Sequence, residues 1–166
     1  MSGLEAYPLK SKERLAALEE FCIYANANEE NLEKLRTLNG ARHAAKSLAS
    51  TDASIVVRAL CFAALLTRNN QKACESFIEH GAINYIIEYL NSSNENFRVE
   101  SLNCLEQISA FPLSSQLFAK FQILTRVIVL LEEGLQMKSD IGFEQAISAI
   151  KIIKNYIKVS PGEAAT

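Results

Sequence analysis

Apolar residues recur three and four positions apart along most of the chain, which is the spacing of one face of an α-helix. The segment 55–66, IVVRALCFAALL, is apolar nearly all round, which predicts a helix that is covered on several sides. Only three prolines and six glycines interrupt the 166 residues, and no sustained alternation of apolar and polar positions is present. The pattern therefore predicts an all-α protein. The clearest helical stripe runs through Phe143, Ile147, Ile150, Ile153 and Ile157.

A longer pattern recurs every 41 residues, at positions 40, 81 and 122. Each copy consists of a short helical run, a corner, an apolar second helix, a polar break and a longer third helix. The short runs are EENLEKLRT, QKACESFIE and SSQLFAKF, and the second helices are ARHAAKSLAS, AINYIIEYLN and ILTRVIVLLEEG. A period of this length indicates stacked repeats, in which each unit buries its apolar faces against its neighbours.

The corner between the first and second helices has a glycine in two of the three copies. At Gly81 the missing Cβ would permit both an unusual backbone angle and a close approach of neighbouring atoms. Gln122 occupies the same place in the third copy. We expect either a wider corner there or a glutamine in an ordinary helical conformation.

Three helices of unequal length at this period resemble the armadillo repeat, over roughly residues 11–158. The resemblance is clearest in GAINYIIEYLNSSNENFRVESLNCLEQISA. It implies an all-α, right-handed α-α superhelix, an armadillo-like solenoid of about three three-helix repeats preceded by an N-terminal capping helix. The expected repeats are 28–68, 69–110 and 111–158, the expected capping helix is 11–25, and 1–10 and 159–166 are expected to be flexible tails.

The resemblance also implies a non-enzymatic scaffold or adaptor that binds a partner polypeptide, an extended peptide or a helix, on the concave face of its long third helices. In nuclear-import adaptors these helices carry a tryptophan and, one turn later, an asparagine. This chain has no tryptophan, so we do not expect it to bind nuclear-import signals. The alternative is that Cys61 and Leu65 only pack between helices. The aligned positions and the matching part of the first helix are Glu20, Tyr24, Cys61, Leu65, Asn103, Gln107, Ser148 and Ile152.

Tyr85 and Tyr89 lie one turn apart on the second helix of the middle copy. Aromatic side chains of this kind often anchor an interface. They could equally cover the core, because second helices of such repeats usually face the convex side.

Two other functions are compatible with the pattern. The segment VVRALCFAALLTRNNQKACESFIEHGAINYII is similar in broad pattern to the armadillo-like nucleotide-exchange factors of the seventy-kilodalton heat-shock chaperones. A short solenoid could also stack end to end into a homo-oligomer, and the stripe from Phe143 to Ile157 makes its C-terminal end the expected contact.

The composition limits the classes of partner and the cellular compartment that we expect. Lysine and arginine total 17 against 19 acidic residues, so no positive field attracts a nucleic acid. No apolar stretch is long enough for a membrane span, and the N-terminus lacks the apolar segment of a secretory signal. We expect a cytoplasmic protein, with the nucleus as a second possible compartment. The four cysteines form no close pair and are expected to be reduced, buried thiols.

The sequence contains few residues that could act in catalysis. His43 and His80 are the only histidines, and Asp52 and Asp140 are the only aspartates. Their spacing supports no nucleophile, base and acid constellation, and no glycine-rich nucleotide loop is present. We expect neither enzyme activity nor a cofactor or metal site.

Overall fold

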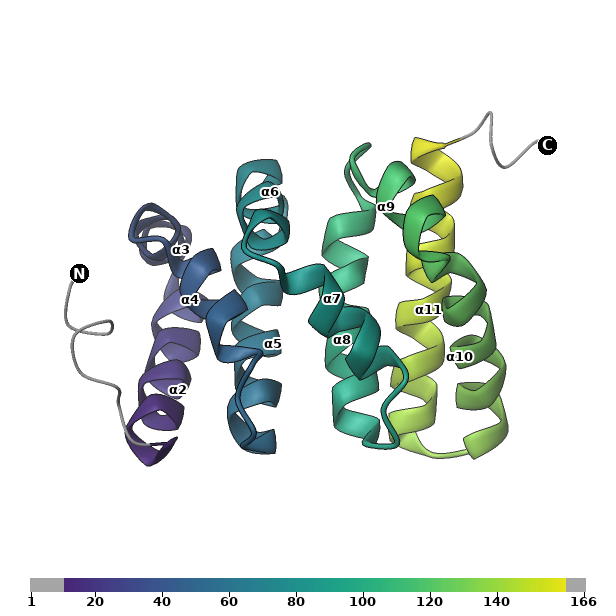
Figure 1. Cartoon of the computed structure of the whole chain (residues 1–166), viewed down its shortest axis with the longest axis horizontal. Coiled ribbons are helices and arrows are strands. Elements are labelled where there is room, and N and C mark those ends of the chain that lie inside the picture. The colour runs from purple at the N-terminus through teal and green to yellow at the C-terminus, as the bar shows by residue number, and fades with distance from the viewer. Residues whose placement is uncertain (1–10, 161–166) are drawn as a thin grey trace. The chain divides into compact units, whose positions relative to one another are not determined.

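The computed structural model describes residues 11–160. The tails expected at 1–10 and from residue 161 onward lie outside this range. Within it the chain is built from ten α-helices and has no β-strand. The chain divides into two compact units, Met1–Ala82 and Ile83–Thr166 (Figure 1).

The first unit contains five described helices that pack around a core of leucine and phenylalanine side chains. The longest two, α2 and α5, lie side by side, and the rings of Phe21 and Phe62 stack with their centroids 5.6 Å apart (Figure 1). The shorter α4 packs on both α5 and α6. The helices of this unit are α2 (Ser11–Ala27), α3 (Glu29–Thr37), α4 (Gly40–Ser47), α5 (Ala53–Thr67) and α6 (Gln71–Glu79). The largest fully buried side chains here are Leu32, Leu48, Ile55, Leu60, Phe62, Leu66 and Phe77.

The second unit consists mainly of three long helices and two short ones. The last helix, α11, packs against both α8 and α10 (Figure 1). Its helices are α7 (Ala82–Leu90), which starts at the last residue of the first unit, α8 (Glu95–Ser109), α9 (Ser114–Phe121), α10 (Ile123–Met137) and α11 (Asp140–Val159). Fully buried side chains of this unit include Ile86, Leu90, Leu102, Leu105 and Phe118.

Several helices start at a polar residue whose side chain accepts a hydrogen bond from a backbone N–H of the first turn, which leaves fewer N–H groups unpaired. The Oδ1 atoms of Asn28, Asp52, Asn70 and Asn94 accept such bonds at the starts of α3, α5, α6 and α8. Ser139 does the same for α11. These caps explain why α3 and α6 begin at the residues that the sequence indicates. The start of α9 has no capping side chain and follows a turn in which Ser114 N–H donates to the carbonyl oxygen of Phe111.

The helix corners use left-handed backbone conformations. Gly81 has φ of 83°, so the unusual angle expected there is confirmed, but a Cβ on Gly81 would have no atom within 4 Å. The close approach expected at Gly81 is therefore wrong. It occurs instead at Gly40, where a Cβ would lie 2.7 Å from the carbonyl oxygen of Leu35, while Asn39 takes the left-handed conformation with φ of 60°.

Gln122 does not have an ordinary helical conformation. Gln122 has φ of 53°, and the axes of α9 and α10 are bent by 80° at this residue. The ordinary helical conformation expected for Gln122 is therefore wrong, and the left-handed conformation costs a non-glycine residue free energy. The expectation of a wider corner stays a prediction.

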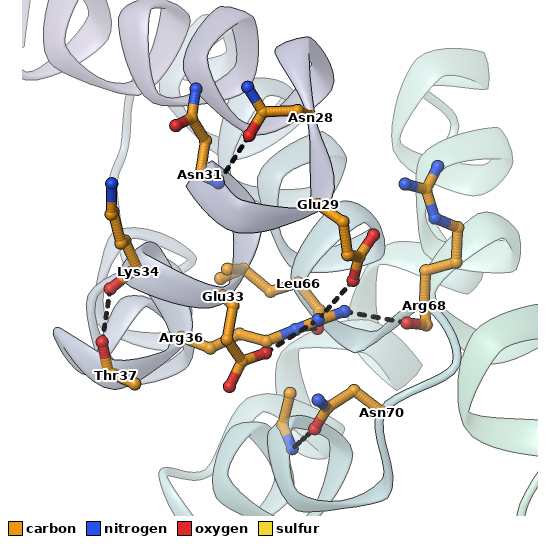
Figure 2. A network of polar contacts seen from close by, with 11 residues as sticks. Asn28, Glu29, Asn31, Glu33, Lys34, Arg36, Thr37, Leu66, Arg68 and Asn70 are labelled. Atoms are coloured by element: carbon orange, nitrogen blue, oxygen red, sulfur yellow. Dashed lines mark hydrogen bonds and ion pairs between the residues drawn. The ribbon is translucent and has the colours of Figure 1, made fainter.

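Arginine side chains tie helix ends together. Figure 2 shows Arg36 on α3, which donates from Nε to the carbonyl oxygen of Leu66 at 2.8 Å and from Nη2 to that of Arg68 at 2.9 Å. Its Nη1 also pairs with Glu29 Oε1 at 3.0 Å and Glu33 Oε2 at 3.2 Å. These bonds satisfy carbonyl groups at the C-terminus of α5 that have no partner within their own helix. In the second unit Arg126 on α10 donates to the carbonyl oxygen of Leu90 in the same way.

The last helix extends further than the sequence indicates. It continues to Val159, and Ser160 after it is buried, with its Oγ 2.6 Å from Ser115 Oγ. The flexible tail expected at 159–166 therefore does not include residues 159 and 160.

Candidate partner-binding surfaces

An open apolar groove lies on the first unit and includes two of the candidate residues, Glu20 and Tyr24. Its volume is about 540 Å³, and its walls come from α2, from α3 and from Leu38 after α3. Tyr24 is 42% exposed and Leu38 is 51% exposed, so both side chains are accessible to a partner. The groove is lined by Glu20, Phe21, Tyr24, Lys34, Leu35, Thr37 and Leu38.

The composition of this groove suits an apolar side chain with polar groups around it. Phe21, Tyr24 and Leu38 provide the apolar surface, while Glu20 and Lys34 place one charge of each sign in the wall. Lys34 Nζ also pairs with Glu30 Oε1 at 2.8 Å. The residues predicted from the sequence include only the α2 wall, because the armadillo resemblance points to long helices such as α2 and not to the short helix α3. The sequence feature that could have indicated the α3 wall is Leu38, a leucine directly after the end of α3.

Cys61 and Leu65 lie one turn apart on α5 and are half-buried. Neither lines the groove at Tyr24. The alternative stated for them, packing between helices, fits their partial burial on a helix that is apolar nearly all round. We therefore leave them out of the binding surface proposed below.

In the second unit the candidate residues form a polar contact between α8 and α11. Ser148 Oγ donates to Asn103 Oδ1 at 2.9 Å, and Asn103 Nδ2 donates to Glu100 Oε2 at 3.4 Å. Ser148 is only 6% exposed and Ile152 is 0% exposed, so these two pack between helices and offer no surface to a partner. Asn103 and Gln107 remain partly accessible on α8.

Tyr89 does not project from the surface as an anchor would. It is 8% exposed, and its ring centroid lies 4.9 Å from that of Phe97 and 6.3 Å from that of Tyr85. Burial raises the pKa of its hydroxyl, with smaller contributions from Glu88 and Tyr85. Tyr89 thus covers the core, as the second reading of this pair supposed, and Tyr85 is half-buried beside it.

The residues that could have suggested chemistry have structural roles where the structure describes them. Asp52 caps α5, and Asp140 lies in the first turn of α11. Cys22, Cys74 and Cys104 are buried, Cys61 is half-buried, and burial raises the pKa of the Cys74 thiol to about 12. Within residues 11–160 no three His, Cys, Asp or Glu side chains are grouped as metal ligands would be.

No single helix of the described chain is both long enough and apolar enough to cross a membrane. Only α9 and α10 taken together reach the necessary length and composition, and they are bent by 80°.

Solved structures with the same arrangement of helices decide the fold. No protein-family model matches the sequence, and no curated protein sequence is significantly similar to it. A designed armadillo repeat protein superposes with a TM-score of 0.72 at 19% sequence identity, covering 93% of this chain. The fold is armadillo-like. The all-α repeat architecture expected from the sequence is thereby confirmed.

Two further armadillo structures extend the comparison. A designed armadillo repeat protein in complex with the peptide (KR)4 gives a TM-score of 0.73 at 19% identity and covers 92% of this chain. The armadillo-repeats-only protein of Plasmodium falciparum gives 0.71 at 19% identity and covers 86% of it. The chain spans 66% of the length of each of the two designed proteins and 61% of the Plasmodium protein. The placement of the repeats at 28–68, 69–110 and 111–158 stays a prediction.

Proposed function

We propose that this armadillo-like chain is a non-enzymatic scaffold that binds a peptide or helix of another protein. The observation that carries the proposal is the groove at Tyr24, where accessible aromatic and aliphatic side chains are combined with Glu20 and Lys34. A designed armadillo repeat protein with the same fold is found in complex with a peptide, which supports a polypeptide as the class of partner.

The chemistry of the groove indicates what the peptide should contain. An apolar or aromatic side chain would fill the space between Phe21, Tyr24 and Leu38. A basic residue next to it could pair with Glu20, and an acidic one with Lys34. Such a peptide is mixed in character, unlike a purely basic one, because the chain lacks the tryptophans that would cover lysine stems. In the second unit, Asn103 and Gln107 provide amide groups on α8 that could bind a peptide backbone.

The same proposal includes no cofactor, no nucleic-acid partner, and a cytoplasmic or nuclear location. Action as a nucleotide-exchange factor of a heat-shock chaperone stays a prediction from the sequence pattern. No contact described above favours it over peptide binding.

Selection from a random-peptide library on the intact protein, followed by titration calorimetry of the selected peptides, tests the groove directly. We expect peptides with an apolar anchor, and we expect Tyr24→Ala to weaken their binding by about tenfold or more, as truncation of an interface aromatic commonly does. Leu38→Glu should have a similar effect, because it puts an unpaired charge into the apolar wall.

Ile23→Glu is the matched control. Ile23 is 66% exposed on the same helix as Tyr24 but does not line the groove, so its substitution should leave peptide affinity unchanged. Selected peptides that bind Tyr24→Ala and Leu38→Glu as tightly as the wild type would place the binding surface elsewhere.

A further inference from the structure

Among the described residues, the second unit has an exposed apolar face. Of the ten large apolar side chains that are clearly exposed among the described residues, seven lie on α10 and α11. On α11 they follow one stripe, and on α10 two of them, Ile128 and Leu135, share a face with the half-buried Leu124 and Leu131. We call the C-terminal face the set Leu124, Ile128, Leu131, Leu135, Phe143, Ile147, Ile150 and Ile157.

The other sides of these two helices are occupied. On α11, Ser148 bonds to Asn103 of α8 and Lys151 pairs with Glu106 of α8 at 3.6 Å. The crossing of α10 and α11 is close, since a Cβ on Gly134 would lie 2.6 Å from the carbonyl oxygen of Gly142. On α10, Arg126 reaches back to the last turn of α7. The C-terminal face is on the remaining side, the side on which a further repeat would stack.

Charged residues beside this stripe are sorted along α11. Asp140 and Glu144 lie near its start, whereas Lys154 and Lys158 lie near its end, and all four are exposed. Asp140 and Lys158 also suit the dipole of their own helix, which accounts for their placement in the first and last turns. The dipole does not account for Lys154, which interrupts the apolar stripe between Ile150 and Ile157.

From this order of charges we infer that the C-terminal face binds a second copy of the chain, with the two α11 helices antiparallel about a two-fold axis that passes between Ile147 and Ile150. In this register Phe143 meets Ile157 of the second copy, and Ile147 meets Ile150. The same register places Glu144 opposite Lys154 and Asp140 opposite Lys158, each twice, because a two-fold interface is self-complementary. The stem of Lys154 would cover apolar surface while its ammonium group reaches the carboxylate. Two cations of the described chain lie near the acidic end: Lys138 in the turn before α11, and Arg98 of α8, whose Nε donates to Gln145 Oε1 at 3.3 Å.

A closed dimer fits the chain better than the end-to-end stacking that the sequence suggested. Stacking of that kind would need a second apolar end face to receive the first. On α2, the first described helix, only two large apolar side chains, Ile23 and Tyr24, are clearly exposed, and Tyr24 belongs to the groove already described. A two-fold pairing of the C-terminal face with itself needs no second surface.

Light scattering and sedimentation equilibrium on the full chain measure the proposed association. We expect a monomer and dimer equilibrium without larger species. Ile150→Glu should shift it strongly to monomer, because it would bury two unpaired carboxylates in the apolar centre of the interface. Ile150 is 50% exposed in the single chain, so its replacement should not unfold the protein. Ile23→Glu, at an exposed isoleucine of α2, is the matched control and should dimerise like the wild type.

Charge reversal tests the register itself. Glu144→Lys alone and Lys154→Glu alone should each raise the dissociation constant by about tenfold, since each change replaces two attractions with two repulsions. The double variant Glu144→Lys with Lys154→Glu should return to near the wild-type value, because the pairs are restored with their signs exchanged. Circular dichroism would verify that all variants keep their helix content.

Each other outcome overturns the inference. A protein that is monomeric at every concentration has no self-association on this face, and larger species that grow with concentration indicate stacking. A double variant as weak as either single variant rules out the antiparallel register. None of these substitutions touches the groove at Tyr24, so peptide binding and dimerisation can fail independently.

Discussion

Arg36 contributes to stability through contacts that its position in the sequence does not reveal. It lies in the last turn of a short helix, where a positive charge interacts favourably with the helix dipole. In the structure its side chain is only 8% exposed and spans from α3 to the carbonyl groups of Leu66 and Arg68 at the end of α5 (Figure 2). Its role in stability depends on those two acceptors, which lie thirty or more positions away in sequence.

Replacing Arg36 with alanine should lower the free energy of unfolding by about 2 kcal/mol or more, because charged hydrogen bonds are lost and the carbonyl of Leu66 is left part-buried without a partner. Urea unfolding followed by circular dichroism measures the change. Lys34→Ala is the control on the same helix: its exposed pair with Glu30 is worth only about 0.3–0.5 kcal/mol. Equal effects of the two substitutions would show that Arg36 does not link the helices.

Whether a candidate residue is accessible to a partner also differs from one residue to the next. The resemblance to armadillo repeats pointed to Glu20 and Tyr24 as aligned positions, and both line the groove in the structure. It could not separate Gln107, which is partly accessible, from Ile152, which is 0% exposed, because both occupy the same position in their repeats. The difference arises from the neighbouring helix that covers Ile152.

At the scale of helices, local signals were sufficient for most boundaries. Capping side chains act within a single turn, so the sequence contains both the cap and the helix that it starts. The packing of helices that are far apart in the sequence cannot be predicted from such local signals. The run ILTRVIVLLEEG indicates a helix that ends at a glycine, whereas Gly134 is buried inside α10, which continues to Met137.

Gly134→Ala tests why that glycine is present. In an isolated helix the change would be stabilising by about 1 kcal/mol. In this protein the new Cβ would lie 2.6 Å from the carbonyl oxygen of Gly142 and 3.1 Å from the backbone nitrogen of Ala146, so α10 and α11 must move apart. We expect a loss of about 1–3 kcal/mol in the free energy of unfolding.

Thermal or urea unfolding provides the measurement for Gly134→Ala, with Gln136→Ala as control. Gln136 is exposed on the same helix, so its replacement should change stability by no more than about 0.5 kcal/mol. A stabilising effect of Gly134→Ala would mean that the two helices do not cross as closely as described.

At the scale of the whole molecule, charge decides which class of partner is excluded from the proposal. With 17 basic and 19 acidic residues the chain has no net positive field. Proteins that bind nucleic acid by phosphate contacts release counterions and depend steeply on salt. A scaffold that binds peptide through an apolar groove should not.

Fluorescence anisotropy with a labelled oligonucleotide should therefore show no saturable binding at physiological salt, while selected peptides keep most of their affinity when the salt concentration is raised. Oligonucleotide binding that saturates under the same conditions would contradict the partner class proposed here. An unrelated basic protein serves as the positive control for the assay.

The sequence by itself determined the helices, their caps, the period of the repeat and the armadillo-like fold, because helix periodicity and capping are local properties of the chain. Only the tertiary structure decided that Asn39 and Gln122 adopt left-handed conformations, that Tyr89, Ser148 and Ile152 are buried, and that Phe21 and Leu38 complete a groove. It also decided which side of α11 is exposed among the described residues. The physical reason is that burial and close approach depend on which neighbouring helix covers a residue, and that helix can be dozens of positions away in sequence.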